Sequence, residues 1–355
     1  MLSNTIIDAI GRTPLVKLRL DSKACGEVYA KLEMMNPYGM KDRVGKQMVL
    51  EAKRRGVLKD GAPIIESSSG TMALGLAVVG TYLGHEVCIV TDKRTDELTL
   101  TKLRALGCRV EVVTEMTHSG WQSARLDRLA QLLAENPDAF CPRQYENKDN
   151  PIAYETLAKE VIDDIGPVDI LVGSVGSGGS LCGTARALKR WNDKLRVVGV
   201  DAVGSVIFDQ FDIPGRLQNG LGNSVVPKNV DHQIIDEVHW TNDEEGFAAT
   251  LKLASEEKIF AGNSAGSVYW VSRWLSTQVE SGTKILAIFP DRGDRYYKNV
   301  YNPEFRAEKG LQGLTLPIEP AFIEYGVQAK EWSYAFLHHD REWSGAGSLP
   351  QMVST

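Results

Sequence analysis

Short apolar segments alternate with longer segments over most of the chain. The short segments are rich in Val and Ile and are bounded by polar or glycine-containing turns, which is the pattern of strands buried on both faces of a sheet. The longer segments have the length and the spacing of apolar residues expected of helices that cross from one strand to the next. The pattern therefore predicts parallel strands joined by crossover helices, an α/β fold.

These elements form two series, preceded by two short strands that we expect at 15–18 and 28–32. The first series ends near residue 148 and is expected to contain a helix at 44–55, a helix ending at 79, a helix at 96–106, and strands at 63–66, 87–90 and 110–113. The second series is expected to contain helices at 154–165, 181–191, 243–256 and 267–276, with strands at 169–172, 197–200 and 285–288.

Two such series predict two doubly wound domains with mostly parallel sheets and a ligand cleft between them. We expect a smaller, mobile domain at 45–148, a larger domain made of 1–44 together with 149–302, and a C-terminal extension at 303–355. The extension has several aromatic residues but little periodicity. It either packs on its own domain or closes over the cleft or a neighbouring subunit, and its role stays open.

Composition narrows the class of protein. The net charge of −6 and the lack of a long Lys/Arg run argue against nucleic acid or an anionic membrane as the principal partner. No apolar run is long enough to cross a bilayer, and the first eight residues lack the pattern of an export signal, so we expect a cytoplasmic enzyme. The five cysteines have no metal-type spacing, and the adjacent His338 and His339 lack a matching partner, so no metal site is predicted.

A lysine loop at 36–43, Asn-Pro-Tyr-Gly-Met-Lys-Asp-Arg, is the first candidate for chemistry. Its proline fixes φ and its glycine tolerates positive φ, so we expect a tight turn that leads into a helix. Lys41 would stand at the positive end of that helix, where the pKa of the amine is lowered and the neutral form that condenses with aldehydes is favoured. By itself, the pattern is more typical of a solvated surface lysine.

A glycine-rich turn at 173–180 follows a buried-type strand and precedes a helix. Its backbone N–H groups, the helix N-terminus and its hydroxyls suit a phosphate, and the contributing residues are Gly176, Ser177, Gly178, Gly179 and Ser180. The turn lacks the ending of a Walker loop and the G-x-G-x-x-G spacing of a dinucleotide-binding motif. A tight turn with a purely structural role is the alternative.

Two further turns, at 66–73 and 262–267, also precede helices. Helix capping is the alternative role of both, although in the first turn it would explain one or two hydroxyls and not all of them. In the second turn, Ser264 either offers its hydroxyl to a ring nitrogen or caps its helix. The first turn suits a carboxylate, through the hydroxyls and N–H groups of Ser68, Ser69, Gly70 and Thr71.

One ligand would account for all four features. It carries an aldehyde for the lysine, a phosphate for the glycine-rich turn and a ring nitrogen for the Ser264 hydroxyl. It works on amino acids, whose carboxylate suits the serine-rich turn. These properties point to pyridoxal 5'-phosphate, and we expect the larger domain to bind it.

From about residue 5 to 297, the chain resembles the cysteine synthase and cystathionine β-synthase family of pyridoxal-phosphate enzymes, also called fold type II. The matching motifs occur in the family's order and include the closing motif at 290–296. The resemblance implies that Lys41 forms the Schiff base, that 176–180 binds the cofactor phosphate and that Ser264 faces the pyridine nitrogen. It also implies that the substrate is bound by Ser68, Ser69, Gly70, Thr71, Met72 and Gln144.

The chain departs from the family pattern near the expected site. The lysine loop is one residue shorter, and Met40 stands in the place of the family serine and its neighbour. Thr71 replaces the asparagine that contacts the ring hydroxyl of the cofactor, and Met72 replaces the next threonine. The site is therefore similar to the family's but altered, and the resemblance does not determine the substrate.

The resemblance implies chemistry at the β-carbon of cysteine or a β-substituted alanine, through an aminoacrylate intermediate. Lys41 would be the general base, and the neutral hydroxyl of Ser264 would leave the pyridine nitrogen largely unprotonated, which suits loss of a β-substituent. Residues 67–71, 120–121 and 236–240 resemble cysteine-desulfhydrase-like members. We therefore expect β-elimination, which converts cysteine to sulfide, pyruvate and ammonia.

Several alternatives stay open. A β-replacement synthase would add a nucleophile after taking O-acetylserine or O-phosphoserine as its donor. A catalytically silent scaffold would bind the cofactor without turnover. Analogy of fold also admits threonine deaminase or threonine synthase, although the lysine loop and Gln144 favour the cysteine branch. The expected partners are a small amino-acid substrate and a second copy of the chain in a homodimer.

Overall fold

The computed structural model describes residues 2–20, 23–118, 120–311 and 313–338. Its larger sheet has eight strands in the order β1-β2-β9-β6-β7-β8-β11-β10. The five from β2 to β8 are parallel, and the antiparallel pairs β1/β2 and β8/β11 flank them. The strands are β1 (Leu15–Lys17), β2 (Glu27–Lys31), β6 (Ile170–Ser174), β7 (Arg196–Ala202), β8 (Glu237–Thr241), β9 (Lys284–Ile288), β10 (Ala321–Phe322) and β11 (Ser333–Phe336).

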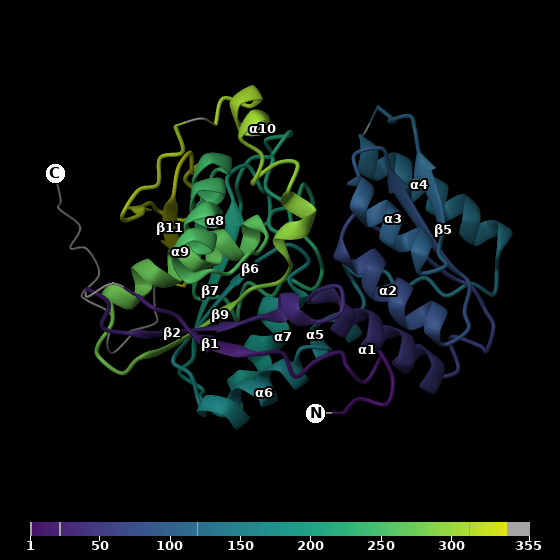
Figure 1. The fold of residues 1–355 in the computed structure, drawn as a ribbon, viewed down its shortest axis with the longest axis horizontal. Helices are drawn as coiled ribbons and strands as arrows, with labels where there is room; N and C mark the ends of the chain where they lie inside the picture. Colours follow the sequence, from purple (N-terminus) through teal and green to yellow (C-terminus); the bar gives the residue numbers. More distant parts are fainter. Residues whose placement is uncertain (1, 21–22, 119, 312, 339–355) are drawn as a thin grey trace.

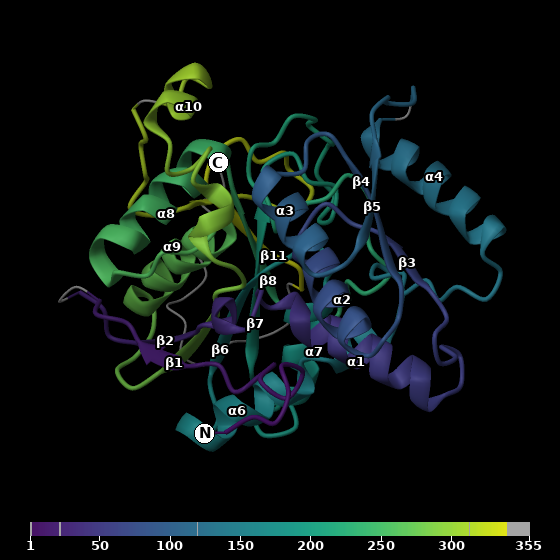
Figure 2. The same cartoon turned by 45° about the vertical axis from the view of Figure 1, so that its right-hand side comes forward.

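The smaller sheet has three parallel strands in the order β3-β4-β5, namely β3 (Ile64–Ser67), β4 (Val87–Asp92) and β5 (Arg109–Val113). Helices α2 (Thr71–Tyr82) and α3 (Glu97–Ala105) pack on one face, and α4 (Trp121–Glu135) packs on the other (Figure 2). The two sheets lie side by side (Figure 1), and α1 (Lys41–Arg54) packs against both α2 and α5 (Asp149–Ile152).

The larger sheet is buried on both faces because successive side chains of its strands alternate between two hydrophobic cores. In β6, Ile170 and Val172 pack in the core under α8 (Asp243–Glu257) and α9 (Asn263–Thr277). Leu171, between them, packs in the core under α6 (Glu155–Ile165) and α7 (Gly179–Leu188). The prediction of an α/β fold with mostly parallel sheets is confirmed.

Two glycines bring α1 and α2 into close contact at the end of the lysine loop. A Cβ at Gly75 of α2 would lie 2.5 Å from the carbonyl oxygen of Lys41, and a Cβ at Gly45 of α1 would collide with the carbonyl group of Gly75. The absence of both side chains allows the first turn of α1 to pack directly on a helix of the smaller sheet. On the other side, the backbone N–H of Met40 donates to the carbonyl oxygen of Pro290, just after β9, at 2.9 Å, so the backbone around Lys41 contacts elements of both sheets.

Several elements differ from those predicted by the hydrophobic pattern. α1 begins at Lys41 and α9 at Asn263, so Lys41 and Ser264 lie inside the first turns of their helices. α4 and β8 were not predicted at all. Leu126, Leu129 and Leu133 of α4 have helical spacing, so the pattern of this helix is present in the sequence and was missed. β8 buries Glu237 and His239 as a hydrogen-bonded pair, which an apolar pattern cannot reveal.

Residues after 302 extend the larger sheet. Strand β11 pairs with β8, and the indole Nε1 of the buried Trp332 donates to Nδ1 of His239 at 3.2 Å. His339, Trp343 and the stretch 344–348 lie outside the described residues. Among the helices that the structure describes, none is both long and apolar enough to cross a membrane. The domain boundaries at 45, 148 and 302, and the mobility of the smaller domain, stay predictions.

Candidate active site

A cavity of about 640 Å³ lies where the loops after β3 and β6 meet the first turns of α1, α2 and α9. This is the carboxyl end of parallel strands, where open α/β sheets bind ligands. Gly178 and Gly179 belong to the same glycine-rich loop but lie outside the wall of the cavity. The other predicted site residues all line it, and they are Lys41, Ser68, Ser69, Gly70, Thr71, Met72, Gln144, Gly176, Ser177, Ser180 and Ser264.

Lys41 is the first residue of α1, and its side chain is half-buried at the cavity wall. Its Nζ donates a hydrogen bond to Oγ of Ser177 at 3.2 Å, so the amine lies at the glycine-rich loop. Desolvation lowers the pKa of Lys41 to about 8, because burial disfavours the charged form of the amine. The amine is therefore available as a nucleophile or base near neutral pH.

The lowered pKa leads to a testable pH dependence. In cofactor-free protein, we expect the rate of pyridoxal phosphate capture to rise with pH and to reach half of its plateau near pH 8, because the neutral amine is the reactive form. An unperturbed lysine would reach that point near its ordinary pKa of 10.5. Stopped-flow absorbance across this pH range provides the measurement, and a midpoint near 10.5 would contradict the assignment.

The glycine-rich loop forms a close-fitting cradle between β6 and α7. Gly178 adopts φ +78°, a left-handed conformation that favours glycine, and a Cβ there would lie 2.6 Å from the backbone nitrogen of Val230. A Cβ at Gly179 would collide with the side-chain amide of Asn150. These two glycines therefore let the loop pack closely while Gly176, Ser177 and Ser180 face the cavity at the N-terminus of α7.

Ser264 offers a hydroxyl with unused hydrogen-bonding capacity. The residue is fully buried in the first turn of α9 and lines the cavity. Its Oγ has no hydrogen-bond partner within the described part of the chain. A buried hydroxyl without a partner is costly, so a ligand atom in the cavity is expected to complete it. This observation and the glycine cradle fit a ligand that presents both a ring nitrogen and a phosphate.

The serine-rich turn leads from β3 into α2. Ser68 is buried, and its Oγ accepts a hydrogen bond from the backbone N–H of Gly70 at 3.3 Å. Thr71 begins α2, and Met72 is buried in the hydrophobic core around α1 and α2 while still reaching the cavity wall. The turn therefore presents hydroxyls and backbone N–H groups of a helix N-terminus to the cavity, as the sequence predicts.

Gln144 is held by groups that sequence reasoning missed. Its backbone N–H donates to Oε2 of Glu66 at 3.4 Å, and its carbonyl oxygen accepts from Nδ2 of Asn150 at 2.7 Å and of Asn229 at 2.9 Å. Glu66 also lines the cavity, and burial raises its pKa to about 7. A carboxylate at the end of an apolar strand was the available signal for Glu66, because such a residue is rarely buried without partners.

Arg125 of α4 is a further cavity residue that the sequence did not reveal. Its side chain is mostly buried, and burial lowers the pKa of its guanidinium. Nε lies 3.4 Å from Oδ2 of Asp92 but makes no hydrogen bond to any described residue. Because Asp92 is also bound by Arg94, the cation at Arg125 is only partly compensated. A desolvated arginine in this state is a candidate anion-binding group.

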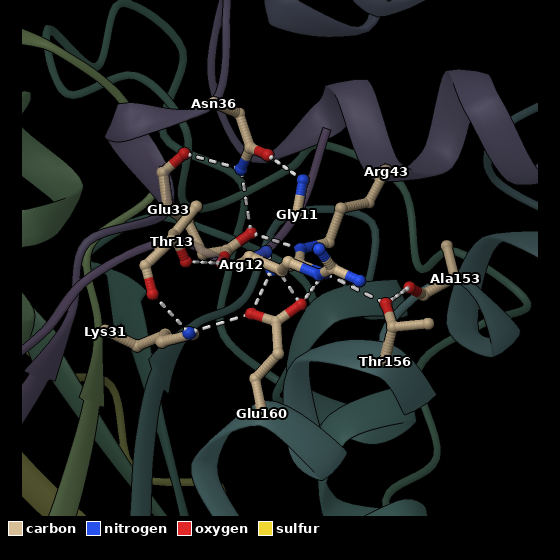
Figure 3. Close-up of polar contacts among 10 residues, drawn as sticks. All are labelled: Gly11, Arg12, Thr13, Lys31, Glu33, Asn36, Arg43, Ala153, Thr156 and Glu160. Atoms are coloured by element: carbon tan, nitrogen blue, oxygen red, sulfur yellow. Dashed lines mark hydrogen bonds and ion pairs between the residues drawn. The ribbon is translucent and has the colours of Figure 1, made fainter. Parts of the chain in front are cut away.

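A buried ionic network fixes the backbone on both sides of Lys41 (Figure 3). Arg43 binds Glu33 through Nε and Nη2, at 2.7 and 2.8 Å, and binds Glu160 of α6 through Nη1 and Nη2, at 2.8 and 2.7 Å. Lys31 pairs with the same Glu160 at 2.8 Å, and Asn36 donates to the Glu33 carboxylate at 3.1 Å. The network therefore holds the lysine loop at Asn36, before Lys41, and at Arg43, after it.

Comparison with known proteins assigns the chain to a family. Residues 6–291 match the sequence model of the family described as pyridoxal-phosphate dependent enzyme. The chain belongs to this family. It is therefore an enzyme, and its cofactor is pyridoxal phosphate, which agrees with the unpartnered hydroxyl of Ser264 and the glycine cradle.

Three similar proteins of this family carry out different reactions. The N-(2-amino-2-carboxyethyl)-L-glutamate synthase of Cupriavidus metallidurans is 37% identical over 345 residues, which cover 93% of this chain and 100% of that protein. The crystal structure of O-acetylserine dependent cystathionine β-synthase from Helicobacter pylori has a TM-score of 0.79 and 32% identity, and covers 85% of this chain and 100% of that chain. The crystal structure of a hydrogen sulfide-producing enzyme from Fusobacterium nucleatum has a TM-score of 0.78 and 30% identity, and covers 83% of this chain and 100% of that chain. The resemblance to the cysteine synthase and cystathionine β-synthase branch is confirmed.

Two motifs that pointed to desulfhydrase-like members of the family, at 120–121 and 236–240, are not part of the described cavity wall. Residues 237–241 form the buried strand β8, in which Glu237 pairs with Arg196 and accepts from His239 at 2.6 Å. Trp121 contacts the side chain of Lys93, with Nζ 5.0 Å from the ring centre. Of the three motifs, only 67–71 lines the described wall.

Proposed function

We propose that this enzyme is a β-replacement synthase that joins the β-carbon of a β-substituted alanine to the amino group of an anionic amino acid. The charge of the cavity wall is the observation that carries the proposal. Five cationic side chains line the described wall against three carboxylates, with Lys41, Arg125, Arg143, Lys228 and Arg295 opposed to Glu66, Glu146 and Asp291. Burial also raises the pKa of Glu66 and of Asp291, which lowers the negative charge of the wall further. Arg143 and Lys228 pair with Glu146, and Arg295 pairs with Asp291, so the excess positive charge lies chiefly at Lys41 and Arg125. Such an excess favours substrates with more than one negative charge.

Arg125 is the cation best suited to a second anionic group. In this proposal the serine-rich turn and Gln144 receive the α-carboxylate of one amino acid, which leaves Arg125 for another acid. Its guanidinium is desolvated and incompletely paired, and a carboxylate or phosphate would bind it through charge-assisted hydrogen bonds. Elimination from cysteine gives this group no role, because cysteine carries a single carboxylate.

The relatives support replacement at the β-carbon. The name of the Cupriavidus metallidurans protein describes a product in which an alanine-derived 2-amino-2-carboxyethyl group is attached to the nitrogen of glutamate. The Helicobacter pylori enzyme is described as O-acetylserine dependent, which indicates an activated serine as donor. By analogy, we propose an activated serine as donor for this chain and glutamate, or an amino acid of similar charge, as acceptor.

In this proposal each of the predicted site residues has a separate role. Pyridoxal phosphate supplies the electron sink that makes the α-proton of a bound amino acid acidic and its β-substituent labile. Lys41 holds the cofactor and, when released by the substrate amine, removes the α-proton, for which a pKa near 8 is suitable. The loop 176–180 holds the phosphate and Ser264 the ring nitrogen. The turn 68–72 and Gln144 orient the substrate carboxylate.

β-Elimination from cysteine is the second candidate function. The similarity to the hydrogen sulfide-producing enzyme of Fusobacterium nucleatum favours it, and it uses the same Lys41 and the same carboxylate-binding turn. The two reactions differ in the second substrate, since elimination requires no acceptor. An acceptor requirement therefore distinguishes them.

One experiment compares the two candidates directly. The enzyme is incubated with O-acetylserine, O-phosphoserine or cysteine, each with and without glutamate, and products are identified by mass spectrometry alongside sulfide and pyruvate assays. We expect one activated serine to give a glutamate adduct and little pyruvate. Sulfide and pyruvate from cysteine at a rate that glutamate does not change would overturn the proposal in favour of elimination.

Substitution of Arg125 tests the basis of the proposal. We expect Arg125→Gln to lower kcat/KM for the anionic substrate by about 10- to 100-fold, because a hydrogen-bonded charge contact is lost. Arg128→Gln on the same helix is the matched control, since Arg128 pairs with Glu111 and does not line the described cavity. Separate KM values for donor and acceptor show which one Arg125 binds, and equal effects of the two substitutions would contradict the role.

A homodimer and a cytoplasmic location stay predictions for this enzyme. Light scattering coupled to size-exclusion chromatography measures the oligomeric state directly. The smaller domain at 45–148 is proposed to move on substrate binding, since the serine-rich turn belongs to the smaller sheet and Lys41 is held between the two sheets.

A further inference from the structure

Asn150 lies behind the cavity, between two parts of the active site. It belongs to the short helix α5 and is fully buried. Its Nδ2 donates to the carbonyl oxygen of Gln144 at 2.7 Å and to Oγ of Ser177 at 3.3 Å. A backbone carbonyl accepts hydrogen bonds and cannot donate them, so the amide face toward Gln144 must be the NH₂ group. The orientation of the Asn150 side chain is thereby determined.

This orientation decides what the hydroxyl of Ser177 can do. A serine hydroxyl has one proton to donate and two lone pairs that accept. One lone pair of Ser177 accepts from Asn150, and the other accepts from Lys41 Nζ at 3.2 Å when that amine is free. The hydroxyl proton therefore points away from Asn150, and away from Lys41 whenever that amine donates. Because Ser177 lines the cavity within the glycine-rich loop, a phosphate held there is the natural acceptor.

The close fit of Asn150 limits its alternatives. A Cβ at Gly179 would overlap its side-chain amide, so glycine at that position leaves the space that the amide occupies. Its other contact, the carbonyl of Gln144, also accepts from Asn229 at 2.9 Å, and the N–H of Gln144 donates to Glu66. Asn150 therefore links the phosphate loop of the larger sheet to the segment that holds Gln144.

We propose that Asn150 is a positioning residue that makes the Ser177 hydroxyl a donor to the cofactor phosphate. It acts through Ser177 and does not line the described cavity itself. The inference uses the cofactor of the family and does not depend on whether the reaction is replacement or elimination. Cofactor affinity is therefore the appropriate readout, because failure of the proposed reaction leaves it unaffected.

The test uses Asn150→Asp in the full-length protein from which the cofactor has been removed. An aspartate has the same shape but accepts where asparagine donates, so the Ser177 proton turns toward residue 150 and away from the phosphate. We expect the Kd of pyridoxal phosphate to rise by about 10- to 100-fold, as for loss of a hydrogen bond to a charged group. The ³¹P resonance of the bound cofactor is expected to shift as its phosphate loses a donor.

Two comparisons separate this role from a structural one. Asn229→Asp makes the same change at the same Gln144 carbonyl, but no hydrogen bond joins Asn229 to Ser177 within the described chain, so we expect its Kd for the cofactor to stay within about threefold of wild type. In a Ser177→Ala background, the effect of Asn150→Asp on Kd is expected to disappear, because its target is gone. If Asn150→Asp does not fold, Asn150→Ala replaces it and is measured with and without Ser177→Ala in the same way. Equal weakening by Asn229→Asp, or an effect of residue 150 that persists without the Ser177 hydroxyl, would overturn the proposal.

Discussion

Replacement of Lys41 by methionine is expected to reduce turnover by about 10³- to 10⁴-fold and to abolish covalent attachment of the cofactor. Methionine keeps an unbranched stem of similar length in the cavity wall but removes the amine that forms the bond and moves the proton. The residual rate would come from cofactor and substrate held in place without a base. Turnover is measured with the substrates identified above, and attachment is measured by borohydride reduction followed by peptide mass spectrometry.

Lys46→Met is the matched control for this prediction. Lys46 lies on the same helix, is half-buried, and donates to the carbonyl oxygen of Ile7 at 2.9 Å outside the described cavity wall. The Lys46→Met protein loses the same charge from the same helix, so we expect its turnover and its covalent attachment of the cofactor to be close to those of wild type. Covalent attachment of the cofactor to another lysine in Lys41→Met, with turnover preserved, would refute the assignment of Lys41.

Arg43→Met is expected to destabilise the fold by about 3–5 kcal/mol, because removal of one partner leaves buried charges without compensation. The carboxylate of Glu33 is fully buried and that of Glu160 largely so, and both are bound by the Arg43 guanidinium. Lys31 still pairs with Glu160 in the variant, but Glu33 loses its cation. The shift of the urea denaturation midpoint, together with the denaturant m-value, measures the loss.

Arg54→Met on the same helix is the control, since Arg54 is exposed and pairs at the surface with Glu51 at 2.7 Å. Surface pairs of this kind contribute little, so the urea midpoint is expected to remain that of wild type. An Arg43→Met protein as stable as Arg54→Met would show that the buried network does not hold the fold together.

The same network predicts how stability changes with pH. Arg43 and Lys31 hold the pKa of Glu160 at about 2, below its ordinary value of 4.5, despite the opposing effect of burial. The stabilising contribution of Glu160 is therefore present above pH 4.5 and is lost as pH falls from 4.5 toward 2. Loss of Arg43 raises the pKa of Glu160 in the folded state. The stability of the Arg43→Met protein is therefore expected to depend less on pH over this acidic range.

The features that sequence reasoning found are local ones. The alternation of apolar strands and helices predicts the parallel α/β fold because each element carries its own periodicity. The glycine-rich loop at 176–180 and the proline-glycine turn before Lys41 are recognisable because turn chemistry depends on adjacent residues. Even so, the helix at Lys41 begins three residues earlier than its apolar pattern predicts, since its first turn is fixed by packing on Gly75.

The features that sequence reasoning missed depend on distant partners. Arg125 lies on a helix that was not predicted, and its proposed role comes from incomplete pairing with Asp92 of another element. Asn150 has no distinguishing context in the sequence, and its proposed role comes from the proximity of Ser177 and Gln144. The motif at 236–240, which drew attention as a reaction signature, forms a structural strand with a buried ion pair.

The sequence by itself therefore determined the fold class and the cofactor, and it predicts Lys41 as the lysine that holds the cofactor, because these follow from periodicity, turn chemistry and motifs of adjacent residues. The tertiary structure alone decided which side chains share the cavity, which hydroxyl is left without a partner and which cations lack full compensation. Burial, desolvation and hydrogen-bond partners arise between segments far apart in the chain, and these quantities control the pKa of Lys41 and the charge of the cavity wall.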